Sequence, residues 1–79
     1  MNPTRYLCDI FPGQTARVSY LFASGSMRRR LQDLGCLEDT PITCLGRSPF
    51  GDPSAFLIRG SVIALRKKDS QKILVTVKD

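Results

Sequence analysis

The segment that most restricts the fold of this chain is a turn-rich loop followed by two short apolar runs. Residues 48–53 contain two prolines and one glycine, and the apolar runs that follow, residues 54–58 and 61–65, are joined through Gly60. Short β-prone runs separated by a glycine turn are typical of a tight β-hairpin. We expect a two-residue turn, Gly60-Ser61, with a positive φ at Gly60.

The length of the chain allows a single domain. A chain of 79 residues buries only about 60% of its unfolded surface and has little core to divide. No run approaches the roughly 18–20 apolar residues that span a bilayer, and no basic and apolar leader opens the chain. We therefore expect one domain, residues 1–79, in a protein that neither spans a membrane nor is visibly secreted.

One helix is predicted after Ser24. Met27, Leu31 and Leu34 recur at helical spacing, and Gly35 follows where helices commonly end in a left-handed residue. The predicted helix, residues 26–34, is about two turns long and is not stable alone. We expect it to pack over the open end of a barrel.

Alternating apolar residues predict further strands at residues 15–21, 41–47 and 72–77. In the first of these, Ala16, Val18 and Tyr20 are expected to share one face. Residues 65–71 lose the alternation and gain charge, which indicates one helical turn. The pattern predicts a mainly β fold: a small SH3-like, partly open β-barrel of about five strands, with one short helix and a charged helical turn.

The chain lacks the residues that catalysis and metal binding usually need. The chain has no histidine, and Cys8, Cys36 and Cys44 are widely spaced with no CxxC pair. Motifs for nucleophilic catalysis, zinc proteolysis and phosphate binding do not occur. We expect no enzyme activity, no cofactor and no bound metal, and we interpret Cys36 and Cys44 as small core residues.

Basic residues and one loop are the candidate binding site. The net charge is +5, and Arg28, Arg29 and Arg30 are its strongest cluster, although successive helical residues diverge by about 100° and at most two can face one surface. Phe50 lies between a proline and a glycine, either tucked over the barrel or exposed to a partner. We predict that Phe50, Asp52 and one or two of these arginines contact a partner.

Two other interpretations compete with this site. The arginines would also suit a solvated helix face, and the carboxylates, Asp52 among them, would suit capping of backbone amides. Nucleic acid is a possible acidic partner, but stacking on bases needs exposed aromatic rings, and Phe and Tyr mostly fall in predicted strands. For the same reason, no aromatic groove for proline-rich peptides is expected.

Several segments form a joint pattern: Pro12-Gly13, residues 27–35, Gly51-Asp52-Pro53 and Arg59-Gly60. Together they resemble the FeoA family of bacterial ferrous-iron uptake over nearly the whole chain. The sequence departs from the family pattern at residues 38–41, where the family usually has a glycine before a strand. We expect Asp39 to adopt the left-handed turn there, because Asp tolerates it better than most residues.

The resemblance implies an SH3-like fold and a cytoplasmic accessory protein. Its implied partner is FeoB, a large membrane transporter with a GTPase domain on the cytoplasmic side, whose ferrous-iron uptake it would support. The same module resembles the C-terminal domain of iron-dependent repressors, but the 79 residues include no DNA-binding helical domain, so we do not expect a repressor. The alternatives are a basic barrel that binds nucleic acid and a stand-alone relative of that repressor domain.

Overall fold

Six strands form one antiparallel sheet in the computed structural model, which describes residues 3–77. The strands are β1 (Thr4–Tyr6), β2 (Thr15–Leu21), β3 (Pro41–Arg47), β4 (Ser54–Ile58), β5 (Ser61–Leu65) and β6 (Ile73–Val77). Three short helices accompany them: a 3-10 helix η1 (Leu7–Asp9), α1 (Gly25–Asp33) and α2 (Lys67–Ser70).

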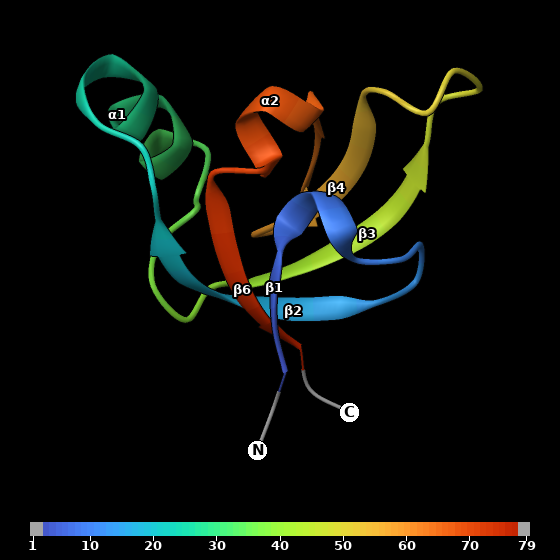
Figure 1. The fold of residues 1–79 in the computed structure, drawn as a ribbon, viewed down its shortest axis with the longest axis horizontal. Coiled ribbons are helices and arrows are strands. Elements are labelled where there is room, and N and C mark those ends of the chain that lie inside the picture. Colours follow the sequence, from blue (N-terminus) through green and yellow to red (C-terminus); the bar gives the residue numbers. More distant parts are fainter. Residues whose placement is uncertain (1–2, 78–79) are drawn as a thin grey trace.

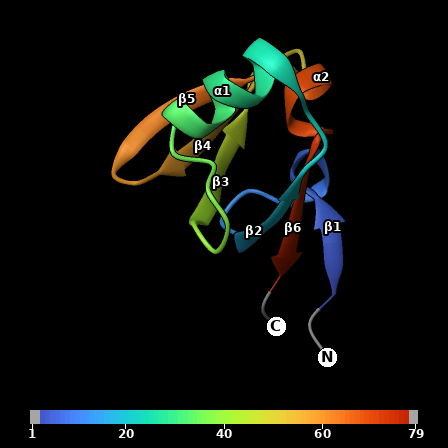
Figure 2. The same cartoon turned by 90° about the vertical axis from the view of Figure 1, so that its left-hand side faces the viewer.

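The sheet curls on itself without closing. Its strand order is β1-β6-β2-β3-β4-β5, so that β1 and β5 end the order and are not paired to each other in the described chain. The helices α1 and α2 both lie at one end of the curled sheet (Figures 1 and 2). The predicted SH3-like, partly open architecture is confirmed.

The prediction of about five strands missed β1. All three of its residues are exposed, so no apolar alternation marks it in the sequence. It is held by pairing with β6, which places Thr4 opposite Thr76 and Tyr6 opposite Leu74. Backbone hydrogen bonds to a neighbouring strand therefore form β1, and side-chain burial does not.

Tyr20 does not share the core face of β2, and this part of the prediction was wrong. Ala16 and Val18 are 2% exposed, whereas Tyr20 is 54% exposed and the next residue, Leu21, is buried. The register against β6 shifts between Val18 and Tyr20. A bulge of this kind inserts one residue, and a shift of one residue moves the following side chains to the opposite face.

The turn between β4 and β5 is one residue earlier than predicted. Ile58 pairs with Ser61, so the turn residues are Arg59 and Gly60, with φ values of 51° and 82°. Two positive φ values define the turn type whose twist matches a right-twisted hairpin. The positive φ at Gly60 is confirmed, and Ser61 belongs to β5.

The core forms where the curled sheet meets α1. Leu31 is fully buried, and Met27 and Leu34 pack partly against the core, which confirms the apolar face of the helix. Gly35 then takes a φ of 106°, and the N–H of Cys36 donates to the carbonyl of Leu31 (3.0 Å), ending the helix. The core contains Leu7, Ile10, Ala16, Val18, Leu21, Leu31, Cys36, Ile42, Cys44, Phe56, Ile58, Leu65, Ile73, Val75 and Val77.

Candidate partner-binding site

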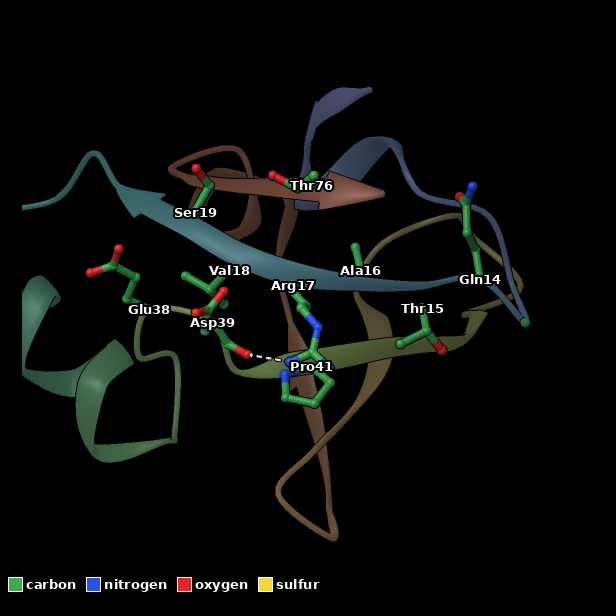
Figure 3. Close-up of a pocket in the computed structure, with 11 residues that line it drawn as sticks. Gln14, Thr15, Ala16, Arg17, Val18, Ser19, Glu38, Asp39, Pro41 and Thr76 are labelled. Atoms are coloured by element: carbon green, nitrogen blue, oxygen red, sulfur yellow. Dashed lines mark hydrogen bonds between the residues drawn. The ribbon is translucent and has the colours of Figure 1, made fainter. Parts of the chain in front are cut away.

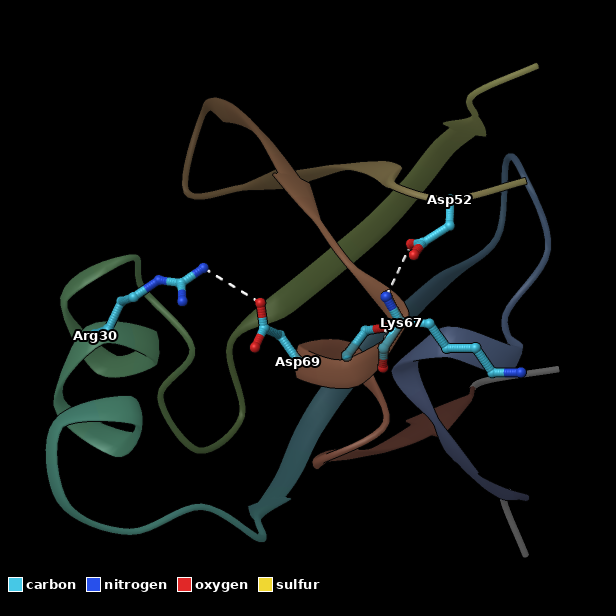
Figure 4. Close-up of polar contacts among 5 residues, drawn as sticks. Arg30, Asp52, Lys67 and Asp69 are labelled. Atoms are coloured by element: carbon cyan, nitrogen blue, oxygen red, sulfur yellow. Dashed lines mark hydrogen bonds and ion pairs between the residues drawn. The ribbon is translucent and has the colours of Figure 1, made fainter. Parts of the chain in front are cut away.

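The predicted site residues come from two segments at the same end of the sheet. Arg28, Arg29 and Arg30 lie on α1, and Phe50 and Asp52 lie in the loop between β3 and β4. The short helix α2 lies between these two segments (Figures 1 and 4). We call α1, α2 and the loop of residues 48–53 the rim.

The three arginines have different roles in the rim. Nη1 of Arg28 donates to the carbonyl of Leu21 (3.2 Å), and Nη2 of Arg30 donates to Oδ2 of Asp69 (3.3 Å). Arg29 is exposed and makes no side-chain hydrogen bond within residues 3–77. The divergence of successive helical residues therefore leaves Arg29 as the most available of the three cations.

The Arg30–Asp69 ion pair connects α1 to α2 (Figure 4). The side chain of Asp69 is only 4% exposed, whereas that of Arg30 is 56% exposed. Oδ1 of Asp69 is buried and has no hydrogen-bond partner in the described part of the chain, so the buried carboxylate is compensated there by Arg30. Sequence reasoning missed Asp69, because a carboxylate in a charged helical turn carries no signal of burial.

Asp52 holds the start of α2. Its Oδ1 accepts a hydrogen bond from the backbone N–H of Lys67 (2.9 Å), the first residue of that helix (Figure 4). The first N–H groups of a helix have no partner inside it, so an oxygen supplied by another loop satisfies one of them. This contact fits the capping interpretation of Asp52, and its contact with a partner stays a prediction.

Phe50 lies at the tip of the loop with 95% of its surface exposed. Two backbone hydrogen bonds hold the turn that carries Phe50. The N–H of Gly51 donates to the carbonyl of Ser48 (2.8 Å), and the N–H of Ser48 donates to the carbonyl of Pro53 (3.0 Å). The ring therefore projects from the loop and is not tucked over the barrel. An exposed aromatic ring on a supported turn is a suitable anchor for a partner.

A second group of exposed aromatic side chains was not expected from the sequence. The rings of Tyr20 and Phe22 lie edge to face with centroids 4.8 Å apart, and those of Tyr6 and Phe22 are 6.2 Å apart. Each of the three is at least 43% exposed. Strand positions bury only some of the aromatic residues: Phe56 in β4 is 1% exposed, whereas Tyr6 on β1 and Tyr20 beyond the bulge in β2 are exposed, and Phe22 lies just past the end of β2.

A surface hollow lies elsewhere, over β2 and the turn before β3 (Figure 3). Its volume is about 810 Å³, and its wall includes Arg17, Glu38 and Asp39. Nη1 of Arg17 donates to the carbonyl of Asp39 (2.9 Å), whose φ of 67° confirms the expected left-handed turn. None of the predicted site residues lines this hollow.

The cysteines behave as packing residues in the described structure. Cys36 and Cys44 are 0% and 1% exposed, and burial raises the pKa of the Cys36 thiol to about 11. Burial, with a smaller effect from the Asp9 carboxylate, also raises the pKa of Cys8. A raised pKa disfavours the thiolate that binds metal, and no group of three or more Cys, Asp or Glu side chains that could hold a metal ion occurs among residues 3–77.

Comparison with known protein families gives a match to the FeoA domain over residues 5–77. The chain belongs to the FeoA family. The solution structure of an FeoA-like protein from Clostridium acetobutylicum is 31% identical, with a TM-score of 0.87, and the match covers 98% of this chain and 90% of that one. Family membership associates the chain with ferrous-iron transport.

Two more distant structures share the fold. FeoA of Stenotrophomonas maltophilia, solved with zinc and described as a prokaryotic SH3 domain protein, is 22% identical with a TM-score of 0.77, over 87% of this chain and 86% of that one. A manganese-dependent transcriptional repressor is 24% identical with a TM-score of 0.85, over 99% of this chain and 44% of the repressor. Comparison with the sequences of curated proteins gave no match.

Proposed function

We propose that this FeoA-family protein is a cytoplasmic accessory protein of ferrous-iron uptake that binds the cytoplasmic part of a FeoB-type membrane GTPase transporter. Family membership supports a role in ferrous-iron transport. Among residues 3–77, no helix is long and apolar enough to cross a membrane. The observation that supports a protein partner is the exposure of two side chains of the rim. Phe50 is 95% exposed, and Arg29 on α1 is also exposed.

The rim divides into contact residues and support residues. Within residues 3–77, the side chains of Phe50 and Arg29 make no hydrogen bond, so they are available to a partner. The ring would supply buried apolar area, which mainly slows dissociation, and the guanidinium would steer association. Arg30 and Asp52 hold α2 on either side, so they would affect binding by positioning the rim. No enzymatic role is proposed for any of these side chains.

The test uses matched pairs of variants. Phe50→Ala is compared with Phe11→Ala, which removes another exposed ring, 69% exposed, in a different loop. Arg29→Glu is compared with Arg5→Glu, which reverses another exposed charge on β1. Binding to the purified cytoplasmic part of the transporter and iron uptake in a complemented deletion strain are measured for each variant. Coincident thermal melts separate lost binding from lost folding.

The expected result is faster dissociation for Phe50→Ala and slower, less salt-dependent association for Arg29→Glu. Both rim variants should restore iron uptake poorly, while the two controls restore it fully. Full rescue and unchanged binding by both rim variants would exclude the rim as the contact surface. Absence of any binding by the parent protein would exclude the transporter as the partner.

One observation favours nucleic acid as a second candidate partner. The exposed rings of Tyr6 and Phe22 border a hollow of about 470 Å³ whose wall also includes Lys67 and Lys72. Aromatic rings beside cations suit stacking on the bases of a single strand while phosphates are neutralised. A nucleic-acid binder would lose affinity for a labelled oligonucleotide steeply with salt, and Phe22→Ala would weaken it. Salt-insensitive or absent oligonucleotide binding would remove this candidate.

A further inference from the structure

The last strand in the sheet order, β5, has one free edge. Among residues 3–77 it pairs only with β4, and it forms the outer border of the sheet on the left of Figure 2. The turn, loop and cap hydrogen bonds of residues 3–77 include none from Val62 or Ala64. An edge strand of this kind can accept a further strand.

The register of the hairpin identifies the backbone groups that face outward. Ile58 pairs with Ser61 directly across the two-residue turn, and Phe56 pairs with Ile63. In an antiparallel ladder, residues alternate between bonding their partner strand and facing away from it. Ser61 and Ile63 therefore bond β4, and the N–H and C=O groups of Val62 and Ala64 point away from the sheet.

The outer face beside this edge is apolar. Leu57 lies opposite Val62 in the β4–β5 ladder, and Ala55 lies opposite Ala64. Val62 is 67% exposed and Leu57 is 37% exposed. Natural edge strands commonly carry a charge, a proline or a bulge that prevents pairing. The segment Ser61–Leu65 contains no charge or proline, and its ladder with β4 has no register shift.

Charges lie only at the two ends of this edge. From residue 54 to residue 66, the chain carries two cations, Arg59 and Arg66, and no carboxylate. Both side chains are exposed, and neither forms an ion pair within residues 3–77. The aliphatic part of Arg59 lies over Gly35, close to where a Cβ on that glycine would stand.

We propose that the free edge of β5 binds an extended segment of a partner protein that has an apolar centre and an acidic residue near each end. The added strand would run antiparallel to β5 and would bond Val62 and Ala64, with its acidic residues near Arg59 and Arg66. Backbone hydrogen bonds would supply affinity, and the two cations would fix the register. This surface is distinct from the rim and does not require the transporter as partner.

Charge argues against a second copy of the chain on this edge. An antiparallel pair of β5 strands centred on Ile63 would bring Arg59 of one copy opposite Lys67 of the other, at both ends of the contact. Each copy also carries a net charge of +5. Like charges directly opposite are destabilising, whereas an acidic segment would neutralise both ends.

The probe is a capped eight-residue peptide, Glu-Thr-Val-Thr-Val-Thr-Val-Glu, whose ends are spaced to meet Arg66 and Arg59. Its matched controls replace both Glu residues with Gln or with Lys. Binding is measured by fluorescence anisotropy at low and high salt, and hydrogen exchange is measured residue by residue. We expect the Glu peptide to bind best, with a salt-dependent affinity and slowed exchange at the amides of Val62 and Ala64.

Two variants of the edge test the geometry. Ala64→Pro removes one outward N–H while leaving the ladder to β4 in place, since proline is tolerated on the free side of an edge strand. This variant should bind the Glu peptide with an affinity about five- to tenfold lower than that of the parent protein. Arg66→Glu should remove the preference for the Glu peptide over the Lys peptide, because Arg59 still favours Glu at the other end, and the double variant Arg59→Glu, Arg66→Glu should reverse it. If Ala64→Pro melts well below the parent, Val62→Pro replaces it.

Several results would overturn the proposal. These are equal binding of the three peptides, no binding of any of them at millimolar concentration, protection confined to another part of the chain, or unchanged affinity in the folded proline variant. Slowed exchange at Val62 and Ala64 without peptide, together with a dimer by sedimentation, would assign the edge to a second copy.

Discussion

Replacing Gly35 by alanine should destabilise the fold more than the same change at a glycine that has free space where a Cβ would stand. Gly35 ends α1 with a φ of 106°, a conformation that L-residues rarely adopt. A Cβ built there would lie 2.7 Å from Cδ of Arg59 and 3.0 Å from Cγ2 of Ile58. The arginine can move, but Ile58 is fully buried in the core and has little room to yield.

The expected cost has two parts. Backbone strain at a positive φ costs about 1–2 kcal/mol for an L-residue. Forcing a methyl group against a packed side chain adds about 1–3 kcal/mol. We therefore expect Gly35→Ala to lower the free energy of unfolding by about 2–5 kcal/mol, and the melting temperature to fall by about 4–8 °C for each kcal/mol in a domain of this size.

Gly13→Ala is the matched control. Gly13 has a similar φ of 89°, but no atom lies within 4 Å of the position that a Cβ would take there, so it should show the backbone cost alone. Urea unfolding followed by circular dichroism measures both variants, with a double variant Gly35→Ala, Arg59→Ala to isolate the arginine contact. Equal losses for Gly35→Ala and Gly13→Ala would refute the argument that close packing against Ile58 adds to the strain.

Four further predictions concern the core, the hairpin turn, a thiol and metal binding. Leu31→Ala should lower the free energy of unfolding by about 2–5 kcal/mol, because the side chain is fully buried. A urea unfolding midpoint close to that of the parent protein would contradict the place of Leu31 in the core. Gly60→Val should cost more than about 1 kcal/mol through strain at a φ of 82°, and coincident thermal melts would show that no such strain exists. The pKa of Cys36 is raised from 9.0 to about 11 in the folded protein, so the unfolded chain loses this proton first and stability should fall as the pH rises through that interval. Cys36→Ala should flatten this part of the stability profile, and an identical slope in the variant would assign it to other groups. Purified protein should retain no stoichiometric iron or zinc after dialysis against a chelator, and metal released only on unfolding, measured by mass spectrometry, would contradict this.

The order and type of most elements follow from local patterns. The spacing of Met27, Leu31 and Leu34 predicts one buried helical face, and the structure begins and ends α1 within one residue of the predicted bounds. The positive φ values at Gly35 and Gly60 also follow from the chain itself, because a residue without a Cβ at a helix end or in a hairpin turn marks a left-handed backbone. These features depend on neighbours a few residues apart.

The binding surfaces depended much more on tertiary structure. The sequence singled out Phe50 and the arginines as candidate contacts. The exposure of the Phe50 ring and the ion pair between Arg30 and Asp69 depend on where the loop and α2 lie in the fold. The aromatic group around Phe22 was missed, since a bulge in β2 determines which way Tyr20 points.

The sequence by itself determined the periodicity of the strands, the apolar face of α1, the glycine positions and the family. Tertiary structure alone decided the recruitment of β1, the outward turn of Tyr20, the burial of Asp69 and the free edge of β5. The physical reason is that periodicity and φ preferences are properties of adjacent residues. Exposure, ion pairing and strand edges arise from contacts between segments far apart in the chain, such as β1 with β6 and Arg30 with Asp69.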